Sequence, residues 1–89
     1  MDIYKTEIDL KPLPHELKIL PKYFDAVVAG VKRFEIRKND RNFQVGERII
    51  LREWDGEQFT GCSAVRTITY ILKDCPEYGL KDGYCIIGF

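Results

Sequence analysis

Residues 30–37 carry the side chains best suited to chemistry in this chain, in the order Gly-Val-Lys-Arg-Phe-Glu-Ile-Arg. The pattern Gly-x-Lys-x-x-Glu-x-Arg places Lys32, Glu35 and Arg37 where a helix is predicted to end and a strand to begin. Lysine and arginine held close together can bind a phosphate or a carbonyl group. A glutamate beside them can accept a hydrogen bond from a nucleobase amino group. The run therefore predicts a polar binding site.

The same three side chains also have a structural interpretation. Glu35 could form an ion pair with Lys32 or Arg37 and hold the helix against the strands. Removing one partner from a buried ion pair costs about 3–5 kcal/mol, whereas an exposed pair contributes about 0–1 kcal/mol. Spacing alone leaves the binding and the structural interpretation open.

The elements that would position this run follow from hydrophobic periodicity. Residues 15–20 are predicted to form a short strand, and residues 21–29 a helix. Pro21 suits the first turn of that helix because its missing N–H is not needed there, and Gly30 suits the left-handed position that follows a helix. The apolar stripe of the helix comprises Phe24, Val27, Val28 and Val31.

The strand after the helix alternates in polarity. Its two predicted faces carry Phe34 with Ile36, and Arg33 with Glu35 and Arg37. Asp55-Gly56 predicts a hairpin turn further along the chain. The strands predicted after the helix are residues 32–38, 47–54, 62–72 and 83–89. The predicted loops are residues 39–42 and 73–82, the second with room for one helical turn.

Five or six strands and one short helix define a mainly β, α+β domain. A parallel α/β sheet needs a helix in each crossover, and the chain offers one. A small, mostly antiparallel β-barrel covers its own edges and is the predicted architecture. This domain is expected to span residues 15–89, after an N-terminal lead-in of residues 1–14. Apolar residues of the lead-in that could cover a sheet edge are Ile3, Ile8, Leu10 and Leu13.

Composition limits the classes of partner. Fourteen basic residues balance fourteen acidic ones, so no overall field attracts polyanions. Residues 31–52 nevertheless hold seven basic and three acidic side chains, which permits a local basic patch. Within this stretch Arg41 and Arg48 are candidates for phosphate contact, with surface solubility as an equal alternative.

The three cysteines are odd in number and none forms a Cys-x-x-Cys pair, so neither a metal site nor a disulfide framework is expected. Reduced, mostly buried thiols are the simpler interpretation of Cys62, Cys75 and Cys85. No signal peptide is recognised and no apolar run approaches twenty residues, so we expect a cytoplasmic protein without a membrane partner. No cofactor is expected.

Histidine and aromatic residues are weaker candidates. His15 could act as an acid or base, but a lone histidine before a strand is more often a capping or surface residue. Tyr23 and Trp54 could stack on bases, although aromatic residues in so small a domain more often belong to the core. Tyr70 and Tyr84 are predicted to be core residues.

Most of the chain beyond residue 14 resembles an ASCH-type domain of the PUA-like β-barrel superfamily. The segments that carry the resemblance are residues 15–20 (His-Glu-Leu-Lys-Ile-Leu), 29–37 (Ala-Gly-Val-Lys-Arg-Phe-Glu-Ile-Arg), 45–51 (Val-Gly-Glu-Arg-Ile-Ile-Leu) and 83–87 (Gly-Tyr-Cys-Ile-Ile). Within that superfamily the chain is similar to a small bacterial and phage branch of unassigned function. The resemblance implies a barrel with a cleft between helix and sheet, lined by the motif residues, and RNA or a nucleotide as the ligand.

Three functions follow as hypotheses, of which we favour RNA or nucleotide binding without a catalytic role. The expected ligand-binding residues are Gly30, Lys32, Arg33, Glu35, Arg37 and Arg48. A second hypothesis is an amidohydrolase that acts on a modified nucleoside through Lys32 and Glu35. In the hydrolytic relatives that the resemblance implies, a threonine attacks from the position that Glu35 occupies here. A protein-interaction adaptor that uses an exposed sheet edge is the third.

Overall fold

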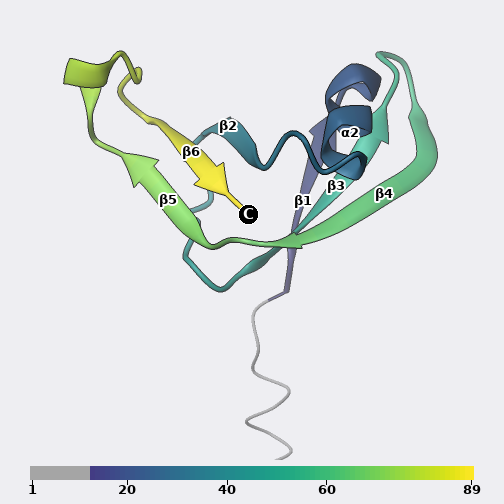
Figure 1. Cartoon of the computed structure of the whole chain (residues 1–89), viewed down its shortest axis with the longest axis horizontal. Coiled ribbons are helices and arrows are strands. Elements are labelled where there is room, and N and C mark those ends of the chain that lie inside the picture. Colours follow the sequence, from purple (N-terminus) through teal and green to yellow (C-terminus); the bar gives the residue numbers. More distant parts are fainter. Residues whose placement is uncertain (1–12) are drawn as a thin grey trace, which may run out of the picture.

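The structure, a computed structural model, describes residues 13–89. Residues 1–12, which hold Ile3, Ile8 and Leu10 of the predicted lead-in, lie outside the described residues. The described part contains two three-stranded sheets, one α-helix and one 3-10 turn (Figure 1). Its elements are β1 (His15–Ile19), α2 (Pro21–Val28), β2 (Phe34–Lys38), β3 (Arg48–Trp54), β4 (Phe59–Thr67), β5 (Tyr70–Lys73), η1 (Pro76–Tyr78) and β6 (Tyr84–Gly88). Neither helix within residues 13–89 is long and apolar enough to cross a membrane.

The first sheet has the strand order β1-β3-β4. β1 runs parallel to β3, whereas β3 and β4 are antiparallel. The β3–β4 hairpin turns at Asp55-Gly56, as the sequence predicts, and the Asp55 amide donates to the carbonyl of Gln58 over 3.1 Å. Parallel neighbours need a long crossover, and here that crossover contains both α2 and β2.

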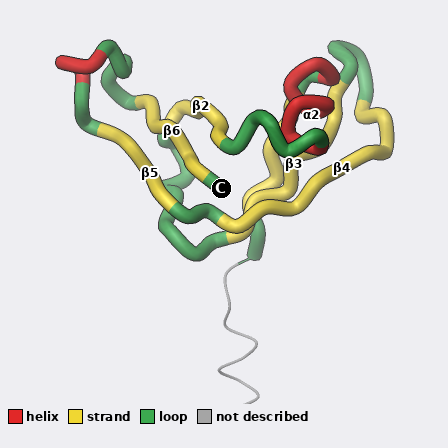
Figure 2. The backbone as a smooth tube through the Cα atoms, in the orientation of Figure 1, coloured by secondary structure: helices red, strands yellow, loops and turns green. Residues whose placement is uncertain are grey.

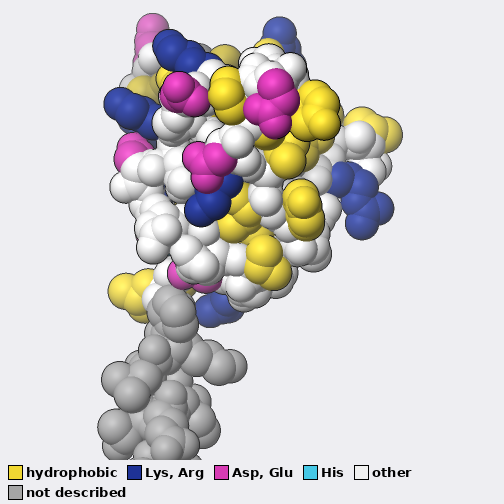
Figure 3. All heavy atoms as spheres, turned by 90° about the vertical axis from the view of Figure 1, so that its left-hand side faces the viewer, with side chains coloured by type: hydrophobic (Ala, Val, Ile, Leu, Met, Phe, Trp, Pro, Cys, Tyr) yellow, Lys and Arg dark blue, Asp and Glu magenta, His cyan; other side chains and the backbone are white. Residues whose placement is uncertain are grey.

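The second sheet has the order β2-β6-β5 and is antiparallel throughout. Its inner face carries the fully buried Cys85 and Ile87. Its outer face is apolar and exposed, with Phe34 and Ile36 of β2 exposed by 44% and 56%. Tyr70 and Leu72 of β5 are exposed on the same face. Figure 3 shows hydrophobic side chains gathered on the side of the molecule where this sheet lies.

The mainly β, α+β class is confirmed, but the predicted closed barrel is wrong because the two sheets stay open. They are joined at a bend in the long strand predicted over residues 62–72, which splits into β4 and β5 (Figure 2). At this bend the backbone of Ile68 pairs with Gly46 and Glu47 at 2.8 Å, while the Thr69 amide donates to Gly88 over 2.8 Å. On the opposite side, β1 and β2 share no ladder.

Side chains occupy the place where a closing strand pair would lie. Arg37 of β2 donates through Nη2 to the main-chain carbonyl of Lys18. Arg41 donates through Nη1 to the carbonyl of Glu16 over 2.7 Å. Two guanidinium groups therefore satisfy carbonyls along the edge of β1 that another strand would otherwise use. We call this gap between β1 and β2 the seam.

The core lies between the first sheet, α2 and the inner face of the second sheet. The largest fully buried side chains are Ile49, Leu51, Ile68, Ile87, Val27 and Cys85. The predicted apolar stripe of α2 is confirmed at Phe24 and Val27, which are buried. It fails at Val28 and Val31, which are 58% and 79% exposed. The helix ends at Val28, so Val31 lies beyond its last turn.

Candidate functional site

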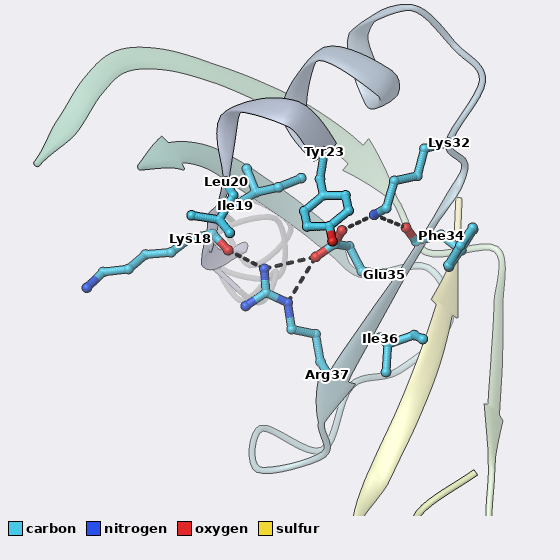
Figure 4. Close-up of a pocket in the computed structure, with 9 residues that line it drawn as sticks. All are labelled: Lys18, Ile19, Leu20, Tyr23, Lys32, Phe34, Glu35, Ile36 and Arg37. Atoms are coloured by element: carbon cyan, nitrogen blue, oxygen red, sulfur yellow. Dashed lines mark hydrogen bonds and ion pairs between the residues drawn. The ribbon is translucent and has the colours of Figure 1, made fainter. Parts of the chain in front are cut away.

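A pocket of about 400 Å³ opens in the seam, beside the first turn of α2 (Figure 4). Its walls come from three elements: the end of β1, the start of α2, and β2 with the residues just before it. The lining residues are Lys18, Ile19, Leu20, Tyr23, Lys32, Phe34, Glu35, Ile36 and Arg37. The site therefore exists because the barrel does not close there.

The turn after α2 brings Lys32 back to this pocket. Gly30 donates to the carbonyl of Val27 over 2.9 Å, and Val31 donates to that of Ala26 over 3.0 Å. These two hydrogen bonds form a Schellman motif, in which the residue after the C-cap takes a left-handed conformation. The φ of Gly30 is +80°, a value that favours glycine. Gly30 thus ends the helix and reverses the chain ahead of Lys32.

The alternation of β2 then turns its charged residues inward. Glu35 is buried and Arg37 half-buried, while Phe34 and Ile36 are exposed. A half-buried strand normally directs its apolar residues to the core. Here the two faces are exchanged, so β2 presents a carboxylate and a guanidinium to the seam.

Glu35 is the centre of the polar group in the pocket. Its residue is 6% exposed, and both carboxylate oxygens accept hydrogen bonds from cations. Lys32 Nζ donates to Oε1, and it donates to the carbonyl of Phe34 over 2.6 Å. Arg37 donates to Oε2 through Nε and Nη2, at 3.1 and 2.9 Å. We call Lys32, Glu35 and Arg37 the ionic triad; it carries one net positive charge.

The ionic triad joins the structural and the binding interpretations. Glu35 fixes both cations, as expected of a structural ion pair, and yet all three side chains line a hollow (Figure 4). A guanidinium has five N–H donors, and Nη1 of Arg37 has no partner among residues 13–89. At least one nitrogen of Arg37 is therefore left to donate to a ligand after the contacts within residues 13–89 are made.

Three of the six predicted binding residues lie outside this pocket. Gly30 and Arg33 line another hollow of about 250 Å³, which Lys32 also lines. Arg48 is exposed at the start of β3 and lines neither hollow. The structure therefore brings Lys32, Glu35 and Arg37 of the predicted set together in the seam pocket. Gly30 and Arg33 meet only Lys32 of these three, in the other hollow, and Arg48 lies apart.

A family model described as a domain of unknown function, DUF3850, matches residues 14–89. The chain belongs to this family. Over 65 residues it is 49% identical to a protein of Escherichia phage P2 titled "Uncharacterized 12.9 kDa protein in GpA 3'region". That alignment covers 71% of this chain and 60% of the phage protein, so the chain spans less than two thirds of that relative. Neither description states a ligand or an activity, and the ASCH-type relationship stays a prediction.

The pocket of the DUF3850 domain includes two residues that sequence reasoning set aside. Tyr23 was a candidate for stacking, with a core position as the favoured alternative; it is 42% exposed and forms a wall of the pocket. Lys18 lies at the seam, with its Nζ 4.0 Å from the ring centre of Trp54. The available signal was its place between Leu17 and Ile19 in a predicted strand, because alternate residues of a strand lie on opposite faces and those two are buried.

His15 has a structural role away from the pocket. Its Nε2 lies 2.8 Å from Oε1 of Glu47, and its ring meets Phe43 edge-on at 4.7 Å between centroids. Glu47 Oε1 also accepts a hydrogen bond from the Gln44 amide over 2.8 Å. The hydrogen bond from His15 lowers the pKa of Glu47 below its usual 4.5, against the opposing effect of burial. This pair ties the start of β1 to the turn before β3.

The charged side chains and the tyrosine ring of the pocket can bind a ligand by charge, hydrogen bonds and stacking. The nine residues that line it include no threonine, the residue that attacks in the hydrolytic relatives implied by the resemblance. Residues 13–89 hold no cluster of three metal-ligating side chains. Cys75 and Cys85 are buried and Cys62 is exposed; none is in a disulfide, and burial raises the pKa of the Cys85 thiol.

Proposed function

We propose that this DUF3850 domain binds a nucleotide, free or as a unit of RNA, in the seam pocket. One observation carries the proposal: a buried, ion-paired carboxylate and two cations share a half-open pocket with an exposed tyrosine ring. Pockets of about 300–1,000 Å³ with few convergent polar groups are typical of small-ligand sites. The volume of about 400 Å³ falls in this range.

Each polar group has a role suited to a nucleotide. Lys32 and Arg37 bind a phosphate or a base carbonyl through donors that Glu35 leaves free. Glu35 Oε1 accepts one hydrogen bond within residues 13–89, from Lys32. A carboxylate oxygen has two lone pairs, so a base amino group can take the second position. This pairing resembles the contact that glutamate makes with cytosine N4.

Stacking supplies the remaining affinity. Tyr23 presents a half-exposed ring to the pocket from the first turn of α2. Stacking of a base on an aromatic side chain contributes about 1–3 kcal/mol and tolerates any base. A base must leave a duplex to enter such a recess, so the proposed ligand is single-stranded or a free nucleotide. Such a ligand is consistent with a cytoplasmic location.

The test is an NMR titration of ¹⁵N-labelled protein with the four ribonucleoside 5′-monophosphates. We expect amide shifts that cluster at residues 18–23 and 32–37. Lys32→Gln is expected to weaken binding about tenfold, which corresponds to about 1.4 kcal/mol. Lys38→Gln is the matched control, since it removes the same charge from an exposed position at the end of β2, the strand that follows Lys32. The proposal fails if no pocket amide shifts, or if both variants bind equally well.

A further inference from the structure

A second hollow adjoins the seam pocket on the other side of Arg37. Its volume is about 280 Å³, and it lies along the edge of β1. The lining residues are Glu16, Leu17, Lys18, Arg37, Arg41, Arg52 and Phe59. Lys18 and Arg37 line both hollows, so the two recesses are consecutive compartments of one groove. We call the second compartment the arginine hollow.

Positive charge is concentrated along this groove. Five cations and two carboxylates line its two compartments, in a chain whose formal net charge is zero. Concave surfaces lined by one sign of charge focus the electrostatic field and attract oppositely charged ligands. The groove is therefore suited to an anion with more than one charge, despite the neutral chain.

Two arginines of the hollow, Arg41 and Arg52, keep most of their N–H donors free of partners within residues 13–89. Arg41 uses Nη1 to reach the Glu16 carbonyl over 2.7 Å, and Arg52 Nη1 lies 3.3 Å from Oε1 of Glu16. These are single contacts within residues 13–89, out of five N–H groups on each guanidinium. The Arg52 side chain is 41% exposed and can contact a ligand directly.

Aromatic rings hold the cations in place. Arg52 lies over the Phe59 ring with 3.8 Å from its Cζ to the ring centre. Phe59 in turn packs edge-on against Trp54, with 5.0 Å between centroids. Alternating cations and aromatic faces are the surface on which single-stranded nucleic acids bind, through phosphate contacts and base stacking.

We infer that the groove binds single-stranded nucleic acid across two successive subsites, with a base in the seam pocket and the adjacent phosphodiester in the arginine hollow. This inference rests on the proposed function, because it assigns the first subsite to the nucleotide already placed there. A single phosphate would need only one cationic site. Because cations line both compartments, on either side of Arg37, the groove can contact at least two phosphates.

The experiment compares uridine 5′-monophosphate with a fluorescein-labelled uridylate decamer, by NMR titration and fluorescence anisotropy respectively. The decamer is expected to bind at least tenfold more tightly. Arg52→Gln and Arg41→Gln are expected to weaken decamer binding fivefold or more while the monophosphate affinity stays the same. Lys81→Gln, which removes an exposed cation outside both compartments, is the control. With two or three phosphates contacted, the slope of log affinity against log salt is about −1.4 to −2.1.

The outcomes separate this inference from the proposed function. If the monophosphate binds but the decamer gains nothing, or if both arginine variants behave like Lys81→Gln, the second subsite is overturned and the nucleotide pocket stands. If neither ligand binds, both proposals fail. A thymidylate decamer distinguishes RNA from DNA as the preferred strand. Equal competition by a glutamate decapeptide would overturn the inference in favour of an acidic polypeptide partner.

Discussion

Arg37 reaches from β2 to the main-chain carbonyl of Lys18 in β1, and this contact spans two strands that share no ladder. The same guanidinium holds the Glu35 carboxylate at 2.9 Å. Arg37 therefore contacts the buried Glu35 carboxylate and the free edge of β1, and its side chain lines both the seam pocket and the arginine hollow. Its removal affects stability and binding together, so the two effects must be measured separately.

We expect Arg37→Ala to lower the free energy of unfolding by about 1.5–3 kcal/mol, since hydrogen bonds to charged groups contribute that much. Glu35 would keep Lys32 as a partner but lose two contacts at Oε2. The free energy of unfolding of Arg37→Lys should lie between those of Arg37→Ala and the wild type. Lysine keeps the positive charge but cannot donate to the carboxylate in the two-point geometry of a guanidinium. Urea unfolding measures the difference, with Lys38→Ala as the control. Equal stability of the Arg37→Ala and Lys38→Ala proteins would contradict this role.

Tyr23 offers a test of stacking in the seam pocket. We expect Tyr23→Ala to lower nucleotide affinity by about 1–3 kcal/mol, and Tyr23→Phe to retain most of it, because the ring face provides the contact. The monophosphate titration is the measurement. Tyr78→Ala is the control, since that ring is 83% exposed on η1 and lines neither compartment. A large loss for Tyr23→Phe would mean that the hydroxyl, rather than the ring, makes the contact.

A substitution of Gly30 tests whether this glycine acts in folding or in ligand binding. Gly30→Ala should destabilise the domain by about 1–2 kcal/mol, the cost of a left-handed conformation for a residue with a Cβ. No atom lies within 4 Å of the added Cβ, so the cost comes from the backbone conformation. Urea unfolding measures this loss of stability. The nucleotide affinity of the folded variant should equal that of the wild type. A tenfold loss of affinity at unchanged stability would reverse the assignment.

The pair of His15 and Glu47 predicts how stability varies with pH. The pKa of Glu47 is lower in the folded state than its usual 4.5, so its contribution is fully present above that pH. The contribution is lost as pH falls through the lower, folded-state pKa. Glu47→Gln should therefore be less stable than wild type near neutral pH, and the gap should close below about pH 4.5. Denaturant unfolding at a series of pH values measures the gap; a gap independent of pH would count against the pairing.

Local signals in the sequence predicted the elements well because local chemistry decides them. Pro21 begins α2, Gly30 follows its end, and Asp55-Gly56 turns the hairpin, each within about a residue of the prediction. The alternation of charged and apolar residues in β2 is also confirmed. These features depend mainly on neighbours in the chain, so the sequence alone predicts them.

Barrel closure could not be read from the sequence because it depends on contacts between distant strands. Residues 62–72 include five β-branched residues and no proline or glycine, so the sequence predicts one continuous strand. The inward residues Ala64 and Ile68 keep the period of two, but Ile71, which packs on the core, breaks it. The bend at Ile68 and Thr69 exchanges the faces and separates the sheets.

The site was half predictable for the same reason. Spacing along β2 placed Glu35 and Arg37 on one face, and the helix end placed Lys32 near them. The opposing wall comes from β1 and α2, and Lys18 and Tyr23 reach it only through tertiary packing. Arg33 and Arg48 share the basic stretch in sequence but lie outside the seam pocket in space. Four other cations of that stretch, Lys32, Arg37, Arg41 and Arg52, do line the two compartments of the groove. Charge density along the chain therefore predicted a local basic surface, but not which of its residues form it.

The arginine contacts at the edge of β1 have a consequence for access. Opening a conventional barrel between two paired strands breaks several main-chain hydrogen bonds at once. Here a rotamer change of Arg37 and Arg41 releases the Lys18 and Glu16 carbonyls, and for Arg37 it also breaks the contacts with Glu35. The edge of β1 that faces β2 is therefore held by two side chains, and the strand ladders of both sheets do not depend on these contacts.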